Sequence, residues 1–117
     1  MDIEEIRKYC LSKKGVAEGF PFNETTLAFK VMGKIFVLTS LEGALYVNLK
    51  CDPASAIELR DNHPAVQPGY HMNKKHWNTV YVDGSMRESL IHQLIDHSYD
   101  MVVAGLSQNL KDQLLSL

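Results

Sequence analysis

The sequence lacks most of the features that assign a chain to a class at once. It has only two cysteines, Cys10 and Cys51, with no CxxC spacing, which excludes a disulfide framework and a zinc ribbon. Its most apolar run, from Ile35 to Leu38, is far too short to cross a bilayer. The residues that follow Met1 are acidic and do not resemble a signal peptide. We therefore expect a soluble, cytoplasmic protein with reduced cysteines and no membrane partner.

Catalytic and cofactor-binding motifs are absent as well. The sequence contains no GxSxG, P-loop or GxGxxG pattern. His76 and Asp83 could in principle form an acid–base pair, but pairs of this kind arise often by chance. Cys51, His63, His71 and His76 follow one another at gaps of 12, 8 and 5 residues, which match no zinc module. We predict a protein with no enzymatic activity, no cofactor and no metal site.

The sequence also lacks a large excess of either positive or negative charge. The 117 residues include 12 basic and 14 acidic side chains, so the net charge of −2 excludes a uniformly basic nucleic-acid coat. The distribution is uneven, because residues 60–87 carry four basic against two acidic side chains and residues 88–117 carry one against four. No linker, repeat or low-complexity tract interrupts the chain. Residues 1–117 are predicted to form one domain with a basic middle and an acidic end.

Capping residues and apolar stripes at helical spacing predict four helices. Asp2, with Glu5 three residues later, and Asp52, followed by proline, are typical helix starts. The sequence Ser85-Met86-Arg87-Glu88 has the pattern of a capping box before a long apolar stripe. The helices are expected over Asp2–Lys13, from Pro53 to about Asn62, from the capping box to Gly105, and after Ser107.

Alternating apolar and polar residues predict strands. The tight turns at Met32-Gly33 and Glu42-Gly43 imply an antiparallel meander, whereas the segment around Gly19 is expected to be a loop and residues 64–68 an irregular stretch. Strands are expected at Thr25–Val31, Lys34–Thr39, Ala44–Lys50 and Trp77–Val82, with a short extended piece around Tyr70. The element order predicts an α+β fold, an antiparallel sheet of four to five strands with helices packed on one face.

The thirteen residues from Pro68 to Val80 are the most distinctive part of the chain. They contain two lysines, two histidines, two asparagines, a tyrosine and the only tryptophan. Basic residues interleaved with aromatic ones can neutralise phosphates and stack on bases. The same residues could instead be structural, with Trp77 anchored in the core and Asn73 and Asn78 satisfying the backbone of a loop. The residue types alone leave both interpretations open.

Lysines on the predicted strands could extend this segment into a basic surface. Lys30 and Lys34 flank the first turn, and Lys50 ends the third strand. If Lys30 and Lys50 share the face away from the helices, they would join Lys74 and Lys75. Five lysine contacts to duplex phosphates would give a salt slope of about −4.5, at about −0.9 per contact. Alternatively, scattered lysines keep an exposed sheet soluble and protect its edges.

Several short segments together resemble a known family. The stretch from Pro68 to Val80 carries most of the resemblance. The other matching segments are Phe20-Pro21-Phe22, Lys30–Phe36, Leu49–Pro53, Asp83-Gly84-Ser85 and Ser98-Tyr99. On these residues the chain resembles the MmcQ/YjbR family of small bacterial proteins, from about Ile3 to Leu115. Arg87 is a departure, because many relatives have proline there, and it affects the start of the long helix.

The resemblance implies an α+β fold akin to frataxin (CyaY) and to the double-wing DNA-binding domain of the phage transcription factor MotA. Members of the family are commonly called DNA-binding on the strength of that fold, which is an analogy between folds rather than between sites. Frataxin-like iron binding would need a dense acidic ridge on the first helix. Asp2, Glu4 and Glu5 are too few for such a ridge.

Two functions follow as hypotheses. The first is a non-catalytic DNA-binding protein of the MmcQ/YjbR family that contacts phosphates through a local basic and aromatic surface. The second is a protein- or small-anion-binding module that uses the 68–80 loop, again without enzymatic activity. The residues predicted to bind nucleic acid are Lys30, Lys34, Lys50, Tyr70, His71, Asn73, Lys74, Lys75, His76 and Trp77.

Overall fold

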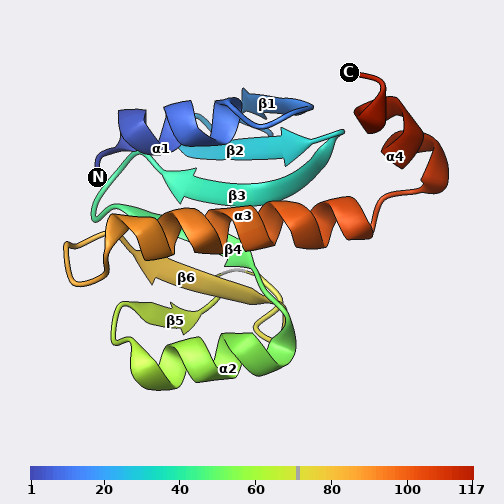
Figure 1. Cartoon of the computed structure of the whole chain (residues 1–117). Coiled ribbons are helices and arrows are strands. Elements are labelled where there is room, and N and C mark those ends of the chain that lie inside the picture. Colours follow the sequence, from blue (N-terminus) through green and yellow to red (C-terminus); the bar gives the residue numbers. More distant parts are fainter. Residues whose placement is uncertain (71) are drawn as a thin grey trace.

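The structure is a computed structural model that describes residues 1–70 and 72–117. Within these residues four helices and six strands follow one another in the order α1 (Ile3–Leu11), β1 (Val16–Gly19), β2 (Thr26–Val31), β3 (Lys34–Ser40), β4 (Tyr46–Lys50), α2 (Pro53–Asn62), β5 (Val66–Pro68), β6 (Trp77–Tyr81), α3 (Glu88–Ala104) and α4 (Gln108–Leu115). The strands form one antiparallel sheet in the order β1-β2-β3-β4-β6-β5 (Figure 1). The predicted α+β class is confirmed, with six strands where four to five were expected.

Three helices lie against one face of the sheet. The long helix α3 crosses β3 and β4 at the centre, α1 lies beside β1 and β2, and α2 lies beside β5 at the other edge (Figure 1). Their apolar side chains meet alternate strand residues such as Phe29, Val47 and Val80 in a single core. Within the described residues no helix packs on the opposite face, which we call the open face. None of the helices in this part of the chain has the length and hydrophobicity to cross a membrane.

A bulge in β3 determines which of its side chains reach the core. The register with β2 shifts after Phe29, so Phe36 has no partner of its own. As a result Phe36 and Val37, although consecutive, are both fully buried on the helix-covered face. Ile35 and Leu38 on either side of them then both turn to the open face, where they line one pocket.

Ser98, in the middle of α3, bonds the backbone of β3 and β4 just beyond their last pair, Val37 and Leu49. Its hydroxyl donates a hydrogen bond to the carbonyl of Phe36 (2.6 Å) and accepts one from the amide of Lys50 (2.8 Å). Both backbone groups would otherwise be buried without a partner at this point. The hydroxyl therefore attaches α3 to the two central strands.

Two strands lie where loops were expected. Val16–Gly19, expected as part of a loop around Gly19, pairs with β2 as the edge strand β1. Val66–Pro68 pairs with β6 as the opposite edge strand β5, in place of an irregular stretch and an extended piece around Tyr70. Both strands are too short to show an alternating pattern, and their neighbours in the sheet determine their conformation. Pro68 is tolerated because an edge strand needs fewer amide donors.

Three of the four predicted helix starts are confirmed. The side chains of Asp2, Asp52 and Ser107 each accept a hydrogen bond from the amide three residues later. These bonds satisfy amide donors that a first helical turn leaves without partners. α1, α2 and α4 therefore begin where the sequence predicts.

The predicted capping box before α3 is wrong. The hydroxyl of Ser85 donates instead to Oδ1 of Asp83 (2.6 Å), within the turn that follows β6. α3 begins only at Glu88, after Arg87, whose side chain makes no capping hydrogen bond. The carboxylate of Asp83 lies nearer to the hydroxyl of Ser85 than the first turn of α3 does, so it takes the hydrogen bond. Burial of the apolar face of α3 stabilises the helix without a side-chain cap.

Candidate functional site

The open face carries two rows of side chains near the centre of the sheet. Partners in an antiparallel ladder point to the same face, so the pairing identifies the members of each row. The first row is Ala28, Leu38, Asn48 and Thr79, and the second pairs Lys30 with Ile35 and Lys50 with Trp77. The first row is uncharged, whereas the second brings two lysines to the end of the sheet where β3 begins.

A pocket of about 300 Å³ lies over the first row, and we call it the open-face pocket. The loop between β1 and β2 contributes Phe22 and Asn23 to one wall, and the loop after β5 contributes Tyr70 and Met72 to the other. Phe22 and Tyr70 are 65% and 60% exposed, so both rings stand at the mouth. The other lining residues are Thr26, Ile35, Leu38, Tyr46 and Asn48. The volume is at the lower end of the range of about 300–1,000 Å³ found for small-molecule sites.

Two buried polar residues hold the Tyr70 wall in place. The hydroxyl of Thr79 accepts a hydrogen bond from the amide of Tyr70 (2.9 Å) and donates one to Oδ1 of Asn48 (2.5 Å). Nδ2 of Asn48 donates in turn to the carbonyl of Tyr70 (3.3 Å). Both backbone groups of Tyr70 are therefore fixed from the sheet, and burial raises the pKa of Tyr46 nearby, which keeps its phenol neutral. The lining residues that the structure describes are uncharged, and three of the nine, Phe22, Tyr46 and Tyr70, are aromatic.

The rest of the loop is held by its own backbone and by α2. Asn73 accepts a hydrogen bond from the amide of Lys75 through Oδ1, and its carbonyl accepts from the amide of Trp77. Arg60 of α2 donates to Oδ1 of Asn78 (2.7 Å) and to the carbonyl of Lys74. Asn73 therefore satisfies the backbone of its own loop, as the structural interpretation of the 68–80 segment expects, whereas the side chain of Asn78 bonds α2 at Arg60 and at the carbonyl of Ala56.

A close approach between backbones requires glycine at position 69. The amide of Gly69 donates to the carbonyl of Trp77 (2.9 Å), and a Cβ at position 69 would lie 2.8 Å from Cβ of Trp77 and 2.9 Å from that carbonyl oxygen. Neither neighbour can move without disturbing the β5–β6 pairing. The Pro68-Gly69-Tyr70 sequence therefore sets the position from which the loop turns over the open face.

The five predicted lysines occupy four different settings. Lys30 and Lys50 share the open face beside the pocket, two strands apart, and Lys75 is exposed on the loop. Lys34 lies opposite the buried Val31, on the helix-covered side. The ammonium group of Lys74 donates to the carbonyl of Gly69 (3.3 Å) in its own loop. The structure therefore brings together two of the five lysines, Lys30 and Lys50, on the open face of the sheet. Lys75 is exposed on the same loop that supplies Tyr70 and Met72 to the pocket wall.

Some basic side chains of the molecule have an ion-pair partner and others do not. On the helix-covered side Arg7 pairs with Glu18 (2.6 Å) and Lys13 with Asp96 (2.5 Å). In the part of the chain that the structure describes, no carboxylate lies within ion-pair distance of Lys30, Lys50 or Lys75. Lysines without anionic partners beside a pocket can meet an anionic ligand without first breaking an ion pair.

The remaining predicted residues are placed less favourably for binding. His76 and Trp77 are half-buried, and the carbonyl of His76 accepts a hydrogen bond from the amide of Cys51. His71 lies outside the described residues. His76 and Asp83 lie at opposite ends of β6, so they form no acid–base pair.

Several residues of the pocket were not predicted from the sequence. Phe22, Ile35 and Leu38 look like ordinary loop and strand residues, and only the fold brings them to the same place. The Phe20-Pro21-Phe22 motif did contain a usable signal, because large aromatic side chains in a polar loop lack an obvious structural role. Asn48 gave no such signal, since one polar residue on a strand is ordinary.

The chain is similar to known proteins along its whole length. The YjbR family model matches residues 11–101. YjbR of Escherichia coli K12, an uncharacterised protein, is 36% identical and covers all of both chains, and YbdF of Escherichia coli O157:H7, also uncharacterised, is 40% identical over 90% of this chain and 87% of its own. The names of these relatives indicate no catalytic activity.

Solved structures show the same fold. The crystal structure of protein DR2400 from Deinococcus radiodurans superimposes with a TM-score of 0.89 at 37% identity, covering 96% of this chain and 86% of that one. A protein from Pseudomonas syringae superimposes with a TM-score of 0.74 at 26% identity, covering 86% of this chain and 98% of that one. The sequence and structural matches cover the sheet and the residues of the open-face pocket, and the chain belongs to the YjbR family.

Proposed function

We propose that the chain is a non-catalytic DNA-binding protein that holds unpaired bases in the open-face pocket and the adjoining phosphates at its lysines. The observation that carries this proposal is an aromatic, uncharged pocket directly beside Lys30 and Lys50, which have no ion-pair partner among the described residues. Aromatic stacking platforms combined with nearby basic side chains are the usual means of binding single strands. The double-wing likeness implied by the sequence supports DNA binding at the level of the fold alone.

The shape of the site favours single-stranded over duplex DNA. A base within a duplex is stacked and paired on both sides, so it cannot enter a pocket unless it is extruded. An unpaired base can stack on Phe22 or Tyr70 at the mouth, and such stacking contributes about 1–3 kcal/mol per base. The neighbouring phosphates would then lie near Lys30 and Lys50.

The test is a fluorescence-anisotropy titration of the protein with a labelled single strand and with the corresponding duplex at low salt. We expect tighter binding of the single strand. Three phosphate contacts, at Lys30, Lys50 and Lys75, give a salt slope of about −2 at about −0.7 per contact. Absence of single-strand binding at low salt, or a consistent preference for the duplex, contradicts the proposal.

Matched variants locate the binding surface. Phe22→Ala is expected to weaken binding roughly 5- to 150-fold, because it removes about 1–3 kcal/mol of stacking. Ile57→Ala, which truncates a comparably exposed apolar side chain on α2, is its control. Lys30→Ala with Lys50→Ala should also weaken binding and make the salt slope shallower by about 1.4. The same double change at Lys8 and Lys111, on α1 and α4, should have much less effect.

A small anionic ligand with one aromatic ring is the second candidate. The observation in its favour is the size of the pocket, which suits a single ring rather than a run of bases. Oligonucleotides of increasing length distinguish the two functions in the same assay. Affinity that rises with length supports strand binding, whereas a mononucleotide that competes as well as a long strand supports the small ligand.

A further inference from the structure

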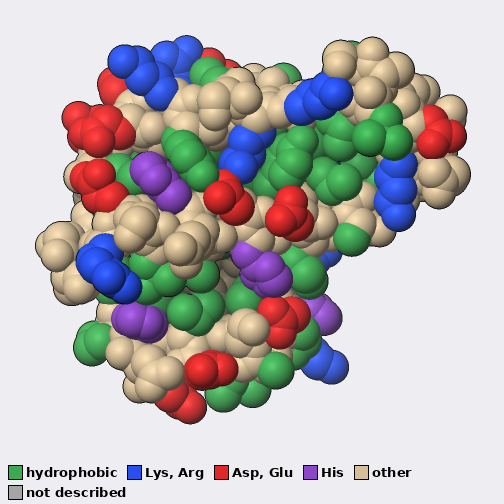
Figure 2. All heavy atoms as spheres, in the orientation of Figure 1, with side chains coloured by type: hydrophobic (Ala, Val, Ile, Leu, Met, Phe, Trp, Pro, Cys, Tyr) green, Lys and Arg blue, Asp and Glu red, His purple; other side chains and the backbone are tan. Residues whose placement is uncertain are grey.

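A second hollow, of about 330 Å³, lies on the helix-covered side between α2 and α3. Cys51, Glu58, His63 and His97 are among the residues of its walls. Figure 2 shows histidine and acidic side chains gathered along the seam between these two helices. Because the hollow opens on the opposite side from the open-face pocket, its chemistry is independent of the proposed DNA binding.

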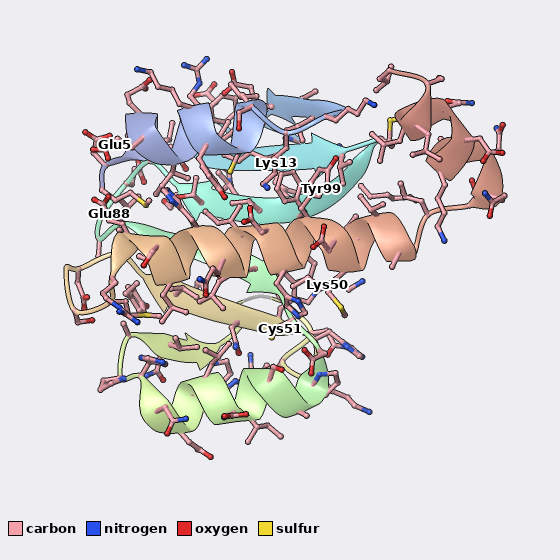
Figure 3. All side chains as sticks on the ribbon, in the orientation of Figure 1. Glu5, Lys13, Lys50, Cys51, Glu88 and Tyr99 are labelled. Atoms are coloured by element: carbon pink, nitrogen blue, oxygen red, sulfur yellow. The ribbon has the colours of Figure 1, made fainter. Side chains whose placement is uncertain are left out.

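Three different potential metal ligands meet at the end of this hollow. Cys51 and Asp52 follow β4 directly, and His97 reaches them from the middle of α3; Cys51 is labelled between α3 and α2 in Figure 3. One ligand atom from each, the thiol sulfur, a carboxylate oxygen and an imidazole nitrogen, lie within 4.8 Å of one another. Oδ1 of Asp52 and Nε2 of His97 lie 3.1 Å apart.

We propose that Cys51, Asp52 and His97 form a binding site for a divalent transition-metal ion of the Zn²⁺ type. Thiolate, imidazole and carboxylate are the ligands that Zn²⁺ takes in proteins, whereas a set with sulfur and nitrogen is unsuited to Mg²⁺ or Ca²⁺. Three protein ligands leave a fourth position for water or a further ligand, and Cys51 and His97 both line the hollow. Glu58 and His63 lie on the same walls and could approach that position.

The spacing of the ligand atoms agrees with tetrahedral coordination. Oxygen and nitrogen ligands at 2.0–2.2 Å from Zn²⁺ stand about 3.3 Å apart at tetrahedral angles, close to the 3.1 Å between Asp52 and His97. A sulfur ligand at about 2.3 Å would stand about 3.6 Å from either. The three ligand atoms lie within 4.8 Å of one another, so the thiol of Cys51 need approach by no more than about 1 Å, which a rotation of its side chain can supply.

Asp52 can bind a metal without giving up its capping role. Its Oδ2 accepts a hydrogen bond from the amide of Ser55 (3.0 Å), whereas Oδ1 faces His97. The amide of Ser55 also holds the pKa of Asp52 below its usual range, so the carboxylate is ionised. Burial raises the pKa of the Cys51 thiol to about 11, and the metal displaces that proton to solvent when sulfur becomes a ligand.

The test is a titration of the full chain, stripped of metal with a chelator, with Co²⁺ as a coloured substitute for Zn²⁺. We expect one equivalent to bind, with visible bands typical of tetrahedral cobalt and a thiolate-to-cobalt charge-transfer band. Added Zn²⁺ should abolish these bands by displacement and raise the melting temperature of the protein. Absence of the charge-transfer band overturns the proposal, because the only thiol of the cluster would then not be a ligand.

Three variants keep the result specific. Cys51→Ala should abolish the charge-transfer band, and His97→Gln should weaken Co²⁺ binding at least about tenfold. His92→Gln is the matched control, because His92 is half-buried on the same helix but stacks on Tyr9 outside the cluster. Far-UV circular dichroism verifies the fold of each variant. Equal binding by the His97→Gln and His92→Gln proteins, or a charge-transfer band that persists in Cys51→Ala, overturns the proposal.

Discussion

The two faces of the sheet use buried polar side chains for different purposes. On the helix-covered face, the hydroxyl of Ser98 satisfies backbone groups of Phe36 and Lys50, where the β3–β4 ladder ends. On the open face, Asn48 and Thr79 are just as buried, but they hold the backbone of Tyr70 over the strands. The first arrangement completes the core, and the second builds one wall of a pocket.

This difference indicates where function can be located in the fold. The hydroxyl of Ser98 only satisfies backbone groups of the sheet, so direct pairing of the strands could replace it without changing the molecular surface. Burying the polar side chains of Asn48 and Thr79 costs free energy, because both lose their contact with water. Their hydrogen bonds hold a loop over the apolar residues of the pocket, an arrangement that stability alone does not require. Lys30 and Lys50 on the open face have no ion-pair partner among the described residues, whereas Arg7 and Lys13 on the helix-covered side do, although Lys34 on that side has none either. Both observations favour the open face as the binding surface.

The largest effect should follow from removing the link between α3 and the sheet. Ser98→Ala leaves the carbonyl of Phe36 and the amide of Lys50 buried without partners, at about 1–3 kcal/mol each. We expect the free energy of unfolding, measured in urea, to fall by about 2–4 kcal/mol. Ser89→Ala, at an exposed position on the same helix, should change it by less than about 0.5 kcal/mol. A similarly small loss in Ser98→Ala would mean that the carbonyl of Phe36 and the amide of Lys50 find other hydrogen-bond partners.

A pair of threonine variants tests the comparison directly. Thr79→Val removes the hydroxyl that holds Tyr70, and Thr39→Val removes the hydroxyl that donates to the carbonyl of Tyr46 (2.6 Å). Each should lower the free energy of unfolding by about 1–2 kcal/mol, because a buried hydrogen bond is lost in both. Only Thr79→Val should speed amide hydrogen exchange at Tyr70. Equal amide exchange rates at Tyr70 in the two variants would show that Thr79 does not hold the loop, and the proposed difference between the two faces would not stand.

Local patterns in the sequence predicted the parts of the fold that depend on local chemistry. Asp2 and Asp52 cap their helices because a short acidic side chain before an apolar stripe has few alternatives. Ser85 had an alternative, the carboxylate of Asp83 two residues away, and the capping box failed. The β3 bulge at Phe36 was not predictable either, since consecutive apolar residues do not reveal which face each one takes.

The candidate site depends on distant pairings, and its prediction was correspondingly incomplete. That Lys30 and Lys50 share a face followed from strand alternation once the meander was predicted. Phe22 and Tyr70 meet across one pocket only because β2 to β6 lie side by side in the sheet. The Asp52–His97 pair was not predictable for the same reason, because spacing along the chain does not reveal contacts between a strand end and a helix.

The smallest effect concerns the paired charges of the helix-covered side. Asp96 on α3 accepts hydrogen bonds from Lys13 (2.5 Å) and Tyr9 (2.7 Å), which tie α1 to α3. Burial acts to raise the pKa of Asp96, but these two donors outweigh it and the net pKa is lowered. The carboxylate therefore stabilises the fold fully above its ordinary pKa of about 4, and that contribution is lost as the pH falls through the lower folded value.

Asp96→Asn keeps a hydrogen-bond acceptor but removes the charge, so it isolates this contribution. Because Asp96 is partly exposed and water screens the pair, we expect a loss of only about 0.5–1 kcal/mol in the free energy of unfolding at pH 7. The difference from the wild type should shrink in urea titrations below about pH 4, where the unfolded carboxyl becomes protonated. Asp100→Asn, at an exposed position one turn further along α3, should show no such pH-dependent difference. If the difference in the free energy of unfolding between wild type and Asp96→Asn stays constant down to about pH 2, the loss comes from the geometry of the amide and not from its missing charge. Paired charges would then not distinguish the helix-covered face from the open face.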